Sequence, residues 1–550
     1  MRIIFVVLLI AVFAGNVTAQ DSMRIAMRNP ENLDPVQLSR FDLDSRDLVE
    51  NLFVGLTRFN SRTGQIDPWL AESWQVSDNG LTWTFQLRND IQWVALKEGK
   101  PEAIRPVTAA DVVFAIQRAC DPNRPSPVAV NIYLIKGCRA FASPNSLEQL
   151  DPNQVIAVRA VDETTVEFDL VFPASFFLTM TSLPEFRPLP AEFVDDSTGL
   201  WFRPDNIITS GAWLITDWQP GVLMKLDRNP FWPDEFAGTV ETVEVRFDVG
   251  IDAIASELVS GSLDFARIDP VLVSTIQTQK PELLHSRDGL SLTLLGFSYN
   301  MVNAEGALVV SPLDNPLVRR ALALALDRDT LAQNVFGFST RGTTHFTPRS
   351  AMAGPSSPGA GFDPAAAVQA LTTAGYPNCA GFGQLPIAVT DQEVVLAQNI
   401  VAQWQANLGC PQEVFPITPI TRRDVLNTAH NTVDVVEGGI RYPLWIISWS
   451  ADYPDAQAWI ADALHCEYGY LRAGRVCDRL DEFMNQAGTT LDNTVRFSAY
   501  NQIENEFFGS QGSFPVIPLV FEQHWTAQNP DLVGISSYGQ LQFDRWSFEG

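Results

Sequence analysis

Residues 442–459 read YPLWIISWSADYPDAQAW, and this stretch combines a buried strand with a polar segment of unusual composition. Its first half is a continuous apolar run of the length expected for a buried strand. Its second half places tryptophans on both sides of two carboxylates, Asp452 and Asp455, and Pro454 excludes a continuous helix between them. Acids and aromatic side chains at the end of a strand are compatible with a catalytic pair, a ligand pocket or a plain turn.

Strand patterns occur well before this stretch. The segment LTWTFQLR, residues 81–88, has an apolar residue at every second position, which predicts a half-buried strand. The segment ETVEVRFDV, residues 241–249, alternates in the same way. Because neither segment shows a longer repeat, these strands belong to a globular sheet rather than to a repeat array.

Helix patterns lie between the strand patterns. VTAADVVFAIQRAC, residues 107–120, predicts a helix that begins at Thr108 with a capping-box acid three residues later. Residues 315–336 predict one long helix opened by Pro316. The Pro- and Gly-rich residues 347–364 predict a surface loop. The mixture indicates an α/β or α+β protein.

Composition limits the size and the partners of the protein. Of the 550 residues, 46% are hydrophobic and 18% charged, so the chain can fill more than one core, since single cores stop growing at about 250–300 residues. We therefore expect at least two lobes. The formal net charge of −27 argues against nucleic acid or an anionic membrane surface as partner, because both require clustered Lys and Arg.

The N-terminal residues 1–19, MRIIFVVLLIAVFAGNVTA, have the pattern of a signal peptide. One arginine precedes a short apolar run, and Val17 and Ala19 form a small-x-small cleavage site before Gln20. No cysteine follows the apolar run, so no lipid anchor of the bacterial lipoprotein type is expected, and no later segment holds eighteen uninterrupted apolar residues. The prediction is a periplasmic or extracellular protein cleaved after Ala19.

The six cysteines are expected to form disulfides in that oxidising compartment. Six thiols allow about 15 pairings, and neighbourhood in the sequence favours three local ones. None of the cysteines has the CxxC spacing of a zinc or redox site. The favoured pairs are Cys120 with Cys138, Cys379 with Cys410, and Cys466 with Cys477.

Seven segments, taken in order, resemble one protein family. They are NLFVGLTRFNSRTGQIDPWLAESWQVSDNGLTWTFQLRNDIQW (51–93), VTAADVVFAIQR (107–118), SGAWLITDWQPGVLMKLDRNPFW (210–232), SGSLDF (260–265), DNPLVRRALALALDR (314–328), FDPAAAVQALTTAGYP (362–377) and WSADYPDAQAW (449–459). The chain is similar to family 5 extracellular solute-binding proteins, the oligopeptide- and dipeptide-binding class of ABC importers, from about Met23 to its C-terminus.

The resemblance implies an α/β, two-lobed fold of the periplasmic-binding-protein type II kind, with an inserted subdomain and a hinge between the lobes. It also implies a cleft between the lobes that closes around a ligand. The expected division after the signal peptide is 20–67 for the first segment of lobe I, 68–196 for the inserted subdomain, 197–300 for the second segment of lobe I, 301–520 for lobe II and 521–550 for the C-terminal segment of lobe I.

The resemblance assigns Asp452 to the α-amino group of a bound peptide, because family members place an aspartate at this position of the motif. A carboxylate in a cleft that excludes water forms a strong charge-assisted hydrogen bond to an ammonium. The alternative is a turn residue before Pro454. Trp449 is expected in the cleft wall, and Tyr453 either there or in the core. Asp455 is expected to stabilise the start of the next helix.

Peptide binders of this class hold the ligand main chain as an added strand. The strand edge is expected from Ile446 to Ser450, with Ile447 and Ser450 among the ligand contacts. Arg40 and Phe41 of the segment QLSRFDL are the expected contacts from lobe I. Ile446 stands where some oligopeptide binders carry a basic residue, so the resemblance identifies no residue for the peptide carboxylate. The nearby Arg441 is expected to face solvent.

The predicted function is the capture of a peptide-like ligand and its delivery to the permease subunits of an ABC transporter, by a monomer without cofactor or metal. Oligosaccharides and nickel chelates are competing ligands on the same fold. The alternative from another class is a secreted glycan hydrolase that uses Asp452 and Asp455 as its paired acids. No histidine pair, nucleophile elbow or phosphate-binding loop supports an enzyme.

Overall fold

The computed structural model describes most of the chain. Its described residues are 21–60, 63–143, 150–194, 201–204, 206–298, 300–302, 308–349, 351–430, 442–472, 475–535 and 539–549. The predicted signal peptide and Arg441 lie outside these ranges. Within them, no helix is both long enough and apolar enough to cross a membrane.

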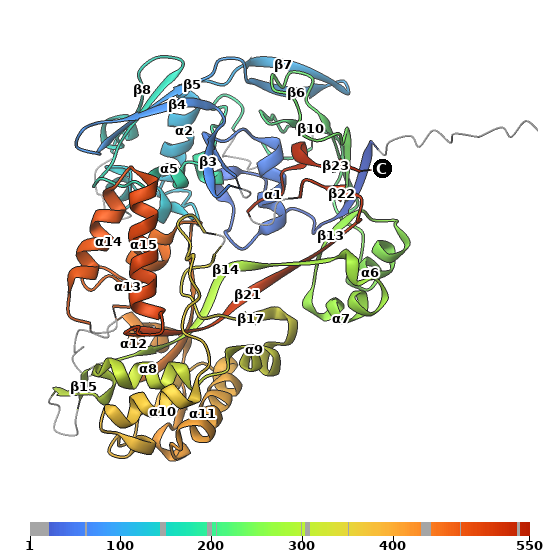
Figure 1. Cartoon of the computed structure of the whole chain (residues 1–550). Helices are drawn as coiled ribbons and strands as arrows, with labels where there is room; N and C mark the ends of the chain where they lie inside the picture. The colour runs from blue at the N-terminus through green and yellow to red at the C-terminus, as the bar shows by residue number, and fades with distance from the viewer. Residues whose placement is uncertain are drawn as a thin grey trace, which may run out of the picture.

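One large mixed sheet runs through the molecule (Figure 1). The strand order is β10-β11-β12-β1-β13-β21-β14-β20-β18-β19, and β17 pairs with β21 beside this path. In sheet order the strands are β10 (Trp213–Gln219), β11 (Leu223–Arg228), β12 (Thr242–Arg246), β1 (Ser22–Ala26), β13 (Phe265–Ile268), β21 (Val516–Gln528), β14 (Leu284–Phe297), β20 (Leu444–Ser450), β18 (Ile387–Val389) and β19 (Ile417–Pro419), with β17 at Thr340–Gly342.

The two long strands β14 and β21 belong to both halves of this sheet. Near one end, β21 pairs with β13, and near the other, β14 pairs with β20. The pairing of β14 with β21 is interrupted between Asp288 and Leu292. We call the half with β1, β10–β13, α6 and α7 lobe one, and the half with β17–β20 and α8–α12 lobe two. Figure 1 shows β14 and β21 running from one to the other.

A separate sheet and a hairpin cover the far side of lobe one (Figure 1). The strands between residues 71 and 169 pair in the order β4-β5-β9-β8, apart from the main sheet. This position agrees with an inserted subdomain, and the exact domain boundaries stay a prediction. The elements are β2 (Thr57–Asn60), β3 (Gln65–Pro68), β4 (Ala71–Val76), β5 (Thr82–Leu87), the hairpin β6 (Gln92–Lys97) and β7 (Lys100–Pro106), α2 (Ala109–Ala119), α3 (Cys138–Phe141), α4 (Pro152–Val155), β8 (Val158–Ala160), β9 (Thr165–Asp169) and α5 (Phe177–Met180).

Helices pack against strands of the main sheet in both lobes. Those of lobe one are α1 (Leu43–Leu52), α6 (Ile251–Ser260) and α7 (Pro270–Gln279). Those that follow are α8 (Pro316–Leu324), α9 (Arg328–Phe336), α10 (Pro364–Thr373), α11 (Val394–Leu408), α12 (Arg422–His430), α13 (Ala456–Leu464), α14 (Arg479–Thr489) and α15 (Asn493–Phe508). The remaining short strands are β15 (Asn300–Val302), β16 (Leu308–Val310), β22 (Leu532–Val533) and β23 (Ser547–Phe548).

Three local predictions are confirmed. Residues 82–87 form β5, with Trp83, Phe85 and Leu87 buried as the alternation requires. Residues 242–246 form β12, and its inward valines are buried. Helix α2 begins after Thr108 with the complete capping box to Asp111, in which the acid accepts the Thr108 backbone N–H at 2.9 Å. In these elements, the alternation of apolar residues and the capping residues therefore predicted the structure correctly.

The long helix predicted for residues 315–336 is wrong, because the stretch forms two helices, α8 and α9. Pro316 does open the first one, which Asn315 caps. The break falls at Asp327, whose side chain accepts the Thr330 backbone N–H at 3.1 Å, while its own N–H donates to Gln403. Aspartate favours such an N-cap over a helix interior, because its side chain competes for backbone hydrogen bonds.

The loop predicted for residues 347–364 is irregular, but it does not lie entirely on the surface. Met352 is buried and pairs with Asp455 in an isolated parallel bridge. Its backbone N–H donates to the Pro454 carbonyl at 2.8 Å, and its carbonyl accepts from Ala456. The Pro and Gly content correctly predicted the lack of regular structure, but it did not predict these backbone contacts with the segment after β20.

All three predicted disulfide pairs are present. Cys120–Cys138 joins the end of α2 to α3, Cys379–Cys410 encloses β18 and α11, and Cys466–Cys477 closes the connection between α13 and α14. No cysteine of the chain remains free. Each bond ties a connection within one part of the molecule, so none of them crosses between the lobes.

Candidate functional site

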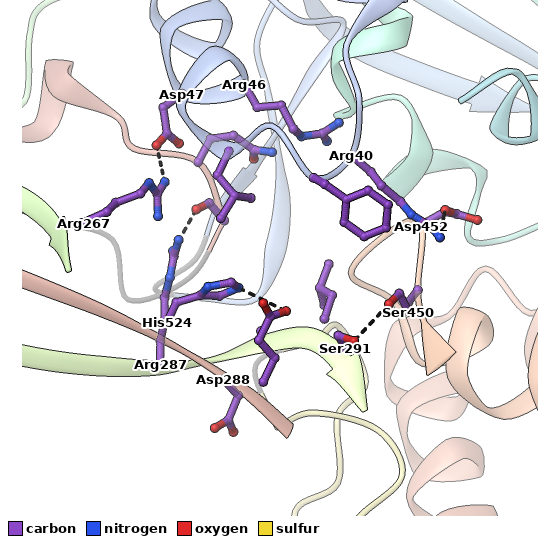
Figure 2. Close-up of a pocket in the computed structure, with 18 residues that line it drawn as sticks. Arg40, Arg46, Asp47, Arg267, Arg287, Asp288, Ser291, Ser450, Asp452 and His524 are labelled. Carbon is purple, nitrogen blue, oxygen red and sulfur yellow. Dashed lines mark hydrogen bonds and ion pairs between the residues drawn. The ribbon is translucent and has the colours of Figure 1, made fainter. Parts of the chain in front are cut away.

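A cavity of about 270 Å³ lies between the lobes, beside the interruption of the β14–β21 pairing. Most of its lining residues come from the segment around the start of α1, the crossing strands β14 and β21, and the end of β20 with the loop after it (Figure 2). Arg267 of β13 and residues 539–540 complete the lining. The cavity therefore touches both lobes and their connection. The lining side chains that matter below are Arg40, Phe41, Arg46, Asp47, Arg267, Arg287, Asp288, Ser291, Ser450, Asp452 and His524.

Asp452 lies in the loop that follows β20 and faces this cavity. Its carboxylate forms an ion pair with the guanidinium of Arg40, which comes from the segment before α1. Both side chains stay about one third exposed, Asp452 at 30% and Arg40 at 37%. The acid thus binds a cationic group that reaches it from lobe one, at a place open to solvent.

Asp455, three residues later, has a different environment. It is fully buried, and its carboxylate binds the guanidinium of Arg496 on α15 and the hydroxyl of Thr179 on α5 at 3.2 Å. It also accepts the Gln457 backbone N–H at 2.9 Å and so caps α13, which confirms its predicted role at the start of that helix. Asp455 therefore offers no carboxylate to the cavity.

Ser450, Phe41 and Arg40 all line the cavity, so the structure brings three of the predicted site residues together with Asp452. The Ser450 hydroxyl donates to Ser291 of β14 at 3.1 Å. The Phe41 ring is 68% exposed, and the Arg40 guanidinium lies 4.8 Å from its centroid. An exposed aromatic ring in a cleft offers contact area to a ligand at little cost in conformational entropy.

Trp449 and Tyr453 lie outside this cavity lining. The Trp449 indole N–H donates to the Ala458 carbonyl at 3.3 Å, and its ring packs against Tyr470. Tyr453 is buried, and its hydroxyl donates to Asp462 at 2.7 Å. Burial, with Asp462 next to it, raises the pKa of the Tyr453 phenol well above its usual value. These contacts fit the core alternative for Tyr453, and the ligand contacts of both residues stay predictions.

Ile447 lies in β20, whose two edges differ. One edge pairs with β14 along the whole strand, from Leu444 to Ser450. The other edge pairs with β18 only at Leu444 and Trp445. Within the described part of the chain, no strand pairs with that second edge from Ile446 onward. An unpaired edge presents backbone donors and acceptors to another extended chain.

The sequence did not identify the charged residues that the crossing strands and α1 bring to the cavity. Arg267 of β13 forms ion pairs with Asp44 and Asp47 of α1, and Arg287 of β14 donates to the Gly539 carbonyl at 2.9 Å. Burial raises the pKa of Asp47, although Arg267 acts against this shift. These residues come from separate parts of the chain, and no local spacing connects them.

His524 of β21 is the one histidine in the described cavity lining. Burial, together with the positive charges of Arg287 and Arg267, lowers the pKa of its imidazole to about 4. It is therefore neutral near pH 7 and adds no charge to the cavity.

One group of possible metal ligands occurs among the described residues, at His465, Cys466 and Asp481. Cys466 is held in the disulfide to Cys477, and Asp481 forms an ion pair with Arg475. A disulfide sulfur is not the thiolate that binds metals. The three residues therefore do not fit a metal centre.

Both the sequence and the fold are similar to those of known proteins. The family model for bacterial extracellular solute-binding proteins, family 5 Middle, matches residues 65–470. The unliganded open form of MppA, a periplasmic murein tripeptide binding protein, superposes with a TM-score of 0.79 at 20% identity, over 96% of this chain and 97% of that one. This match shows a two-lobed fold of the same class.

Two curated relatives from Escherichia coli (strain K12) match part of the chain. The probable deoxycholate-binding periplasmic protein YgiS is 28% identical over 321 residues, 58% of this chain and 55% of the relative. The periplasmic oligopeptide-binding protein OppA is 30% identical over 299 residues, 53% of this chain and 49% of the relative. The matched segments thus span about half the length of each relative. Since the family model covers most of the chain and the two-lobed fold agrees with it, the protein belongs to the bacterial extracellular solute-binding proteins of family 5.

Proposed function

We propose that the protein binds peptides in the cleft between its lobes, outside the cytoplasm, and delivers them to the permease subunits of an ABC transporter. Asp452 receives the α-ammonium group of the peptide, and the lobes close around it. The proposal includes a monomer that acts without cofactor and releases its ligand unchanged. The family membership and the two-lobed fold support a binding role rather than a catalytic one.

The observation that carries the proposal is the ion pair between Asp452 and Arg40. The carboxylate is partly exposed in the cavity between the lobes and already holds a cationic nitrogen. A peptide ammonium presents N–H donors of the same charge and can take the place of the guanidinium. When the lobes approach, water leaves the cavity and the charge-assisted hydrogen bond becomes stronger.

The open edge of β20 supports an extended peptide as the rest of the ligand. It runs from Ile446 to Ser450, toward the loop that holds Asp452. A peptide added there forms main-chain hydrogen bonds that do not depend on its sequence. An oligosaccharide or a metal chelate has no repeating N–H and C=O groups to match such an edge.

The hydrolase alternative requires two carboxylates that face each other across a substrate. Asp455 is buried, caps α13 and is paired with Arg496, so it cannot act with Asp452 on a ligand. The geometry therefore argues against this pair of acids as catalysts.

Calorimetric titration of the mature protein with tri-alanine tests the proposal. Asp452→Asn should weaken binding about 10- to 100-fold, because a hydrogen bond to a charged group contributes about 1.5–3 kcal/mol. Asp217→Asn, an exposed acid of β10, is the charge-matched control and should bind as the unchanged protein does. Equal affinity of the Asp452→Asn protein, or binding of sugars but of no peptide, would contradict the proposal.

A further inference from the structure

Arg46 lies in the first turns of α1, and its side chain lines the cavity between the lobes. Figure 2 shows it on the same side of the cavity as Arg40, which reaches to Asp452. The residue is only 7% exposed. Yet among the residues that the structure describes, the Arg46 guanidinium makes no hydrogen bond and no ion pair. A buried arginine without partners is rare, because its desolvation is costly.

The other arginines of the cavity are engaged. Arg40 binds Asp452, Arg267 binds the two acids of α1, and Arg287 binds a backbone carbonyl. Arg46 is thus the arginine of the described cavity lining whose donors remain for a ligand.

The charge of Arg46 acts on the pKa of Glu185, a buried acid that follows α5 in the chain. Its carboxylate accepts from Asn131 at 2.6 Å and forms no ion pair with Arg46 among the described residues. Burial raises the pKa of Glu185, while the charge of Arg46 lowers it and that of Asp452 raises it. Arg46 and Asp452 thus act on the same buried carboxyl group with opposite sign, and both line the cavity.

We propose that Arg46 is the anion-binding residue of the cleft, and that it pairs with a carboxylate that the ligand carries close to the ammonium bound by Asp452. This inference rests on the proposed function. The planar guanidinium binds a carboxylate through two parallel hydrogen bonds. A cavity of about 270 Å³ has room for one peptide residue with both of its charged groups. The preferred ligands are then peptides with an acidic first residue or dipeptides with a free C-terminus.

Two matched peptide pairs distinguish these sources of the carboxylate. Glu-Ala-Ala amide against Gln-Ala-Ala amide tests the first side chain, and Ala-Ala against Ala-Ala amide tests the terminal carboxylate. Calorimetry of the mature protein should show, in at least one pair, a preference for the carboxylate of about 10-fold or more. Arg46→Gln should abolish this preference, so that the carboxylate and amide members of each pair bind with equal affinity.

Two further variants complete the test. Arg46→Lys keeps the charge but not the paired hydrogen bonds, so it should retain only part of the preference, and its thermal melting curve reports whether the fold is intact. Arg159→Gln changes the same charge on β8, away from the cavity, and should retain all of the preference. If the unchanged protein shows no preference in either pair, or if the preference survives in Arg46→Gln, this inference falls while the proposed function stands. If none of the four peptides binds, both fall.

Discussion

Two aspartates three residues apart have opposite roles in this protein. Asp452 is partly exposed and holds a single guanidinium at the cavity, whereas Asp455 is sealed in the core with Arg496. Strand β20 ends at Ser450, and in the segment that follows, one acid faces the cleft while the other binds Arg496 of α15. The chemistry available to each carboxylate follows from its surroundings rather than from the residue type.

At this scale we expect Asp455→Ala to destabilise the protein by about 3–5 kcal/mol, because it leaves the Arg496 charge buried without its partner and removes the cap of α13. The midpoint of urea unfolding, followed by tryptophan fluorescence, measures the effect. Asp452→Ala is the matched control and should shift the midpoint little, because partly exposed ion pairs contribute about 0.2–1 kcal/mol. Similar shifts for the two variants would contradict these assignments.

The role of Asp455 as the cap of α13 could be predicted from the sequence, because an acid just before a helix is a local signal. The position of Arg46 could not. The segment around Arg46 shows only a run of mixed charges in the sequence. Arg46 stands out only after folding, because its side chain then lines the cavity without a partner among the described residues. For Trp449 the sequence alone could not distinguish burial from ligand contact, because a large aromatic ring suits both. The structure shows its ring against Tyr470.

At the scale of elements, the strands that form the cleft were predicted less well than those of the inserted sheet. The strand β5 alternates because one face is buried, so its pattern is visible in the sequence. The strands β14 and β21 change their neighbours along their length, and their burial changes with them. No single period describes such a strand, which is why the sequence did not reveal the crossing.

The disulfide Cys379–Cys410 encloses β18 and α11, which build the part of lobe two next to β20. Its loop of 31 residues restricts the unfolded chain, an effect of about 4 kcal/mol in the chain-entropy description. We expect replacement of both Cys379 and Cys410 by Ala to lower the melting temperature of the protein. The Cys466–Cys477 loop of 11 residues is shorter, so its removal should lower it less. Calorimetric scans compare the two variants, and the reverse order would contradict this argument.

At the scale of the whole molecule, two strands connect the two lobes, and the proposed function depends on a hinge at this connection. Each strand keeps its pairing within a lobe, while the interruption between Asp288 and Leu292 leaves the crossing free of a continuous ladder. Few residues then need to change when the lobes approach. The ion pair between Arg40 and Asp452 joins the lobes at the cavity, and under the proposed function a peptide ammonium displaces the guanidinium.

A ligand can shift the equilibrium between open and closed forms only by its differential affinity for them. In this protein that difference comes from groups that contact both lobes at once, which are Asp452 after β20 and the arginines around α1. A ligand that contacts only one lobe binds without bringing the lobes together. Under the proposed function, recognition by the permease and affinity for the peptide are therefore coupled through one hinge.

Small-angle X-ray scattering of the mature protein, with saturating tri-alanine and with its N-acetylated form, tests this account most directly. The free ammonium should bring the lobes together and reduce the radius of gyration, and the acetylated peptide, which has no charge for Asp452, should leave it unchanged. Equal compaction by both peptides, or compaction by neither, would contradict the account.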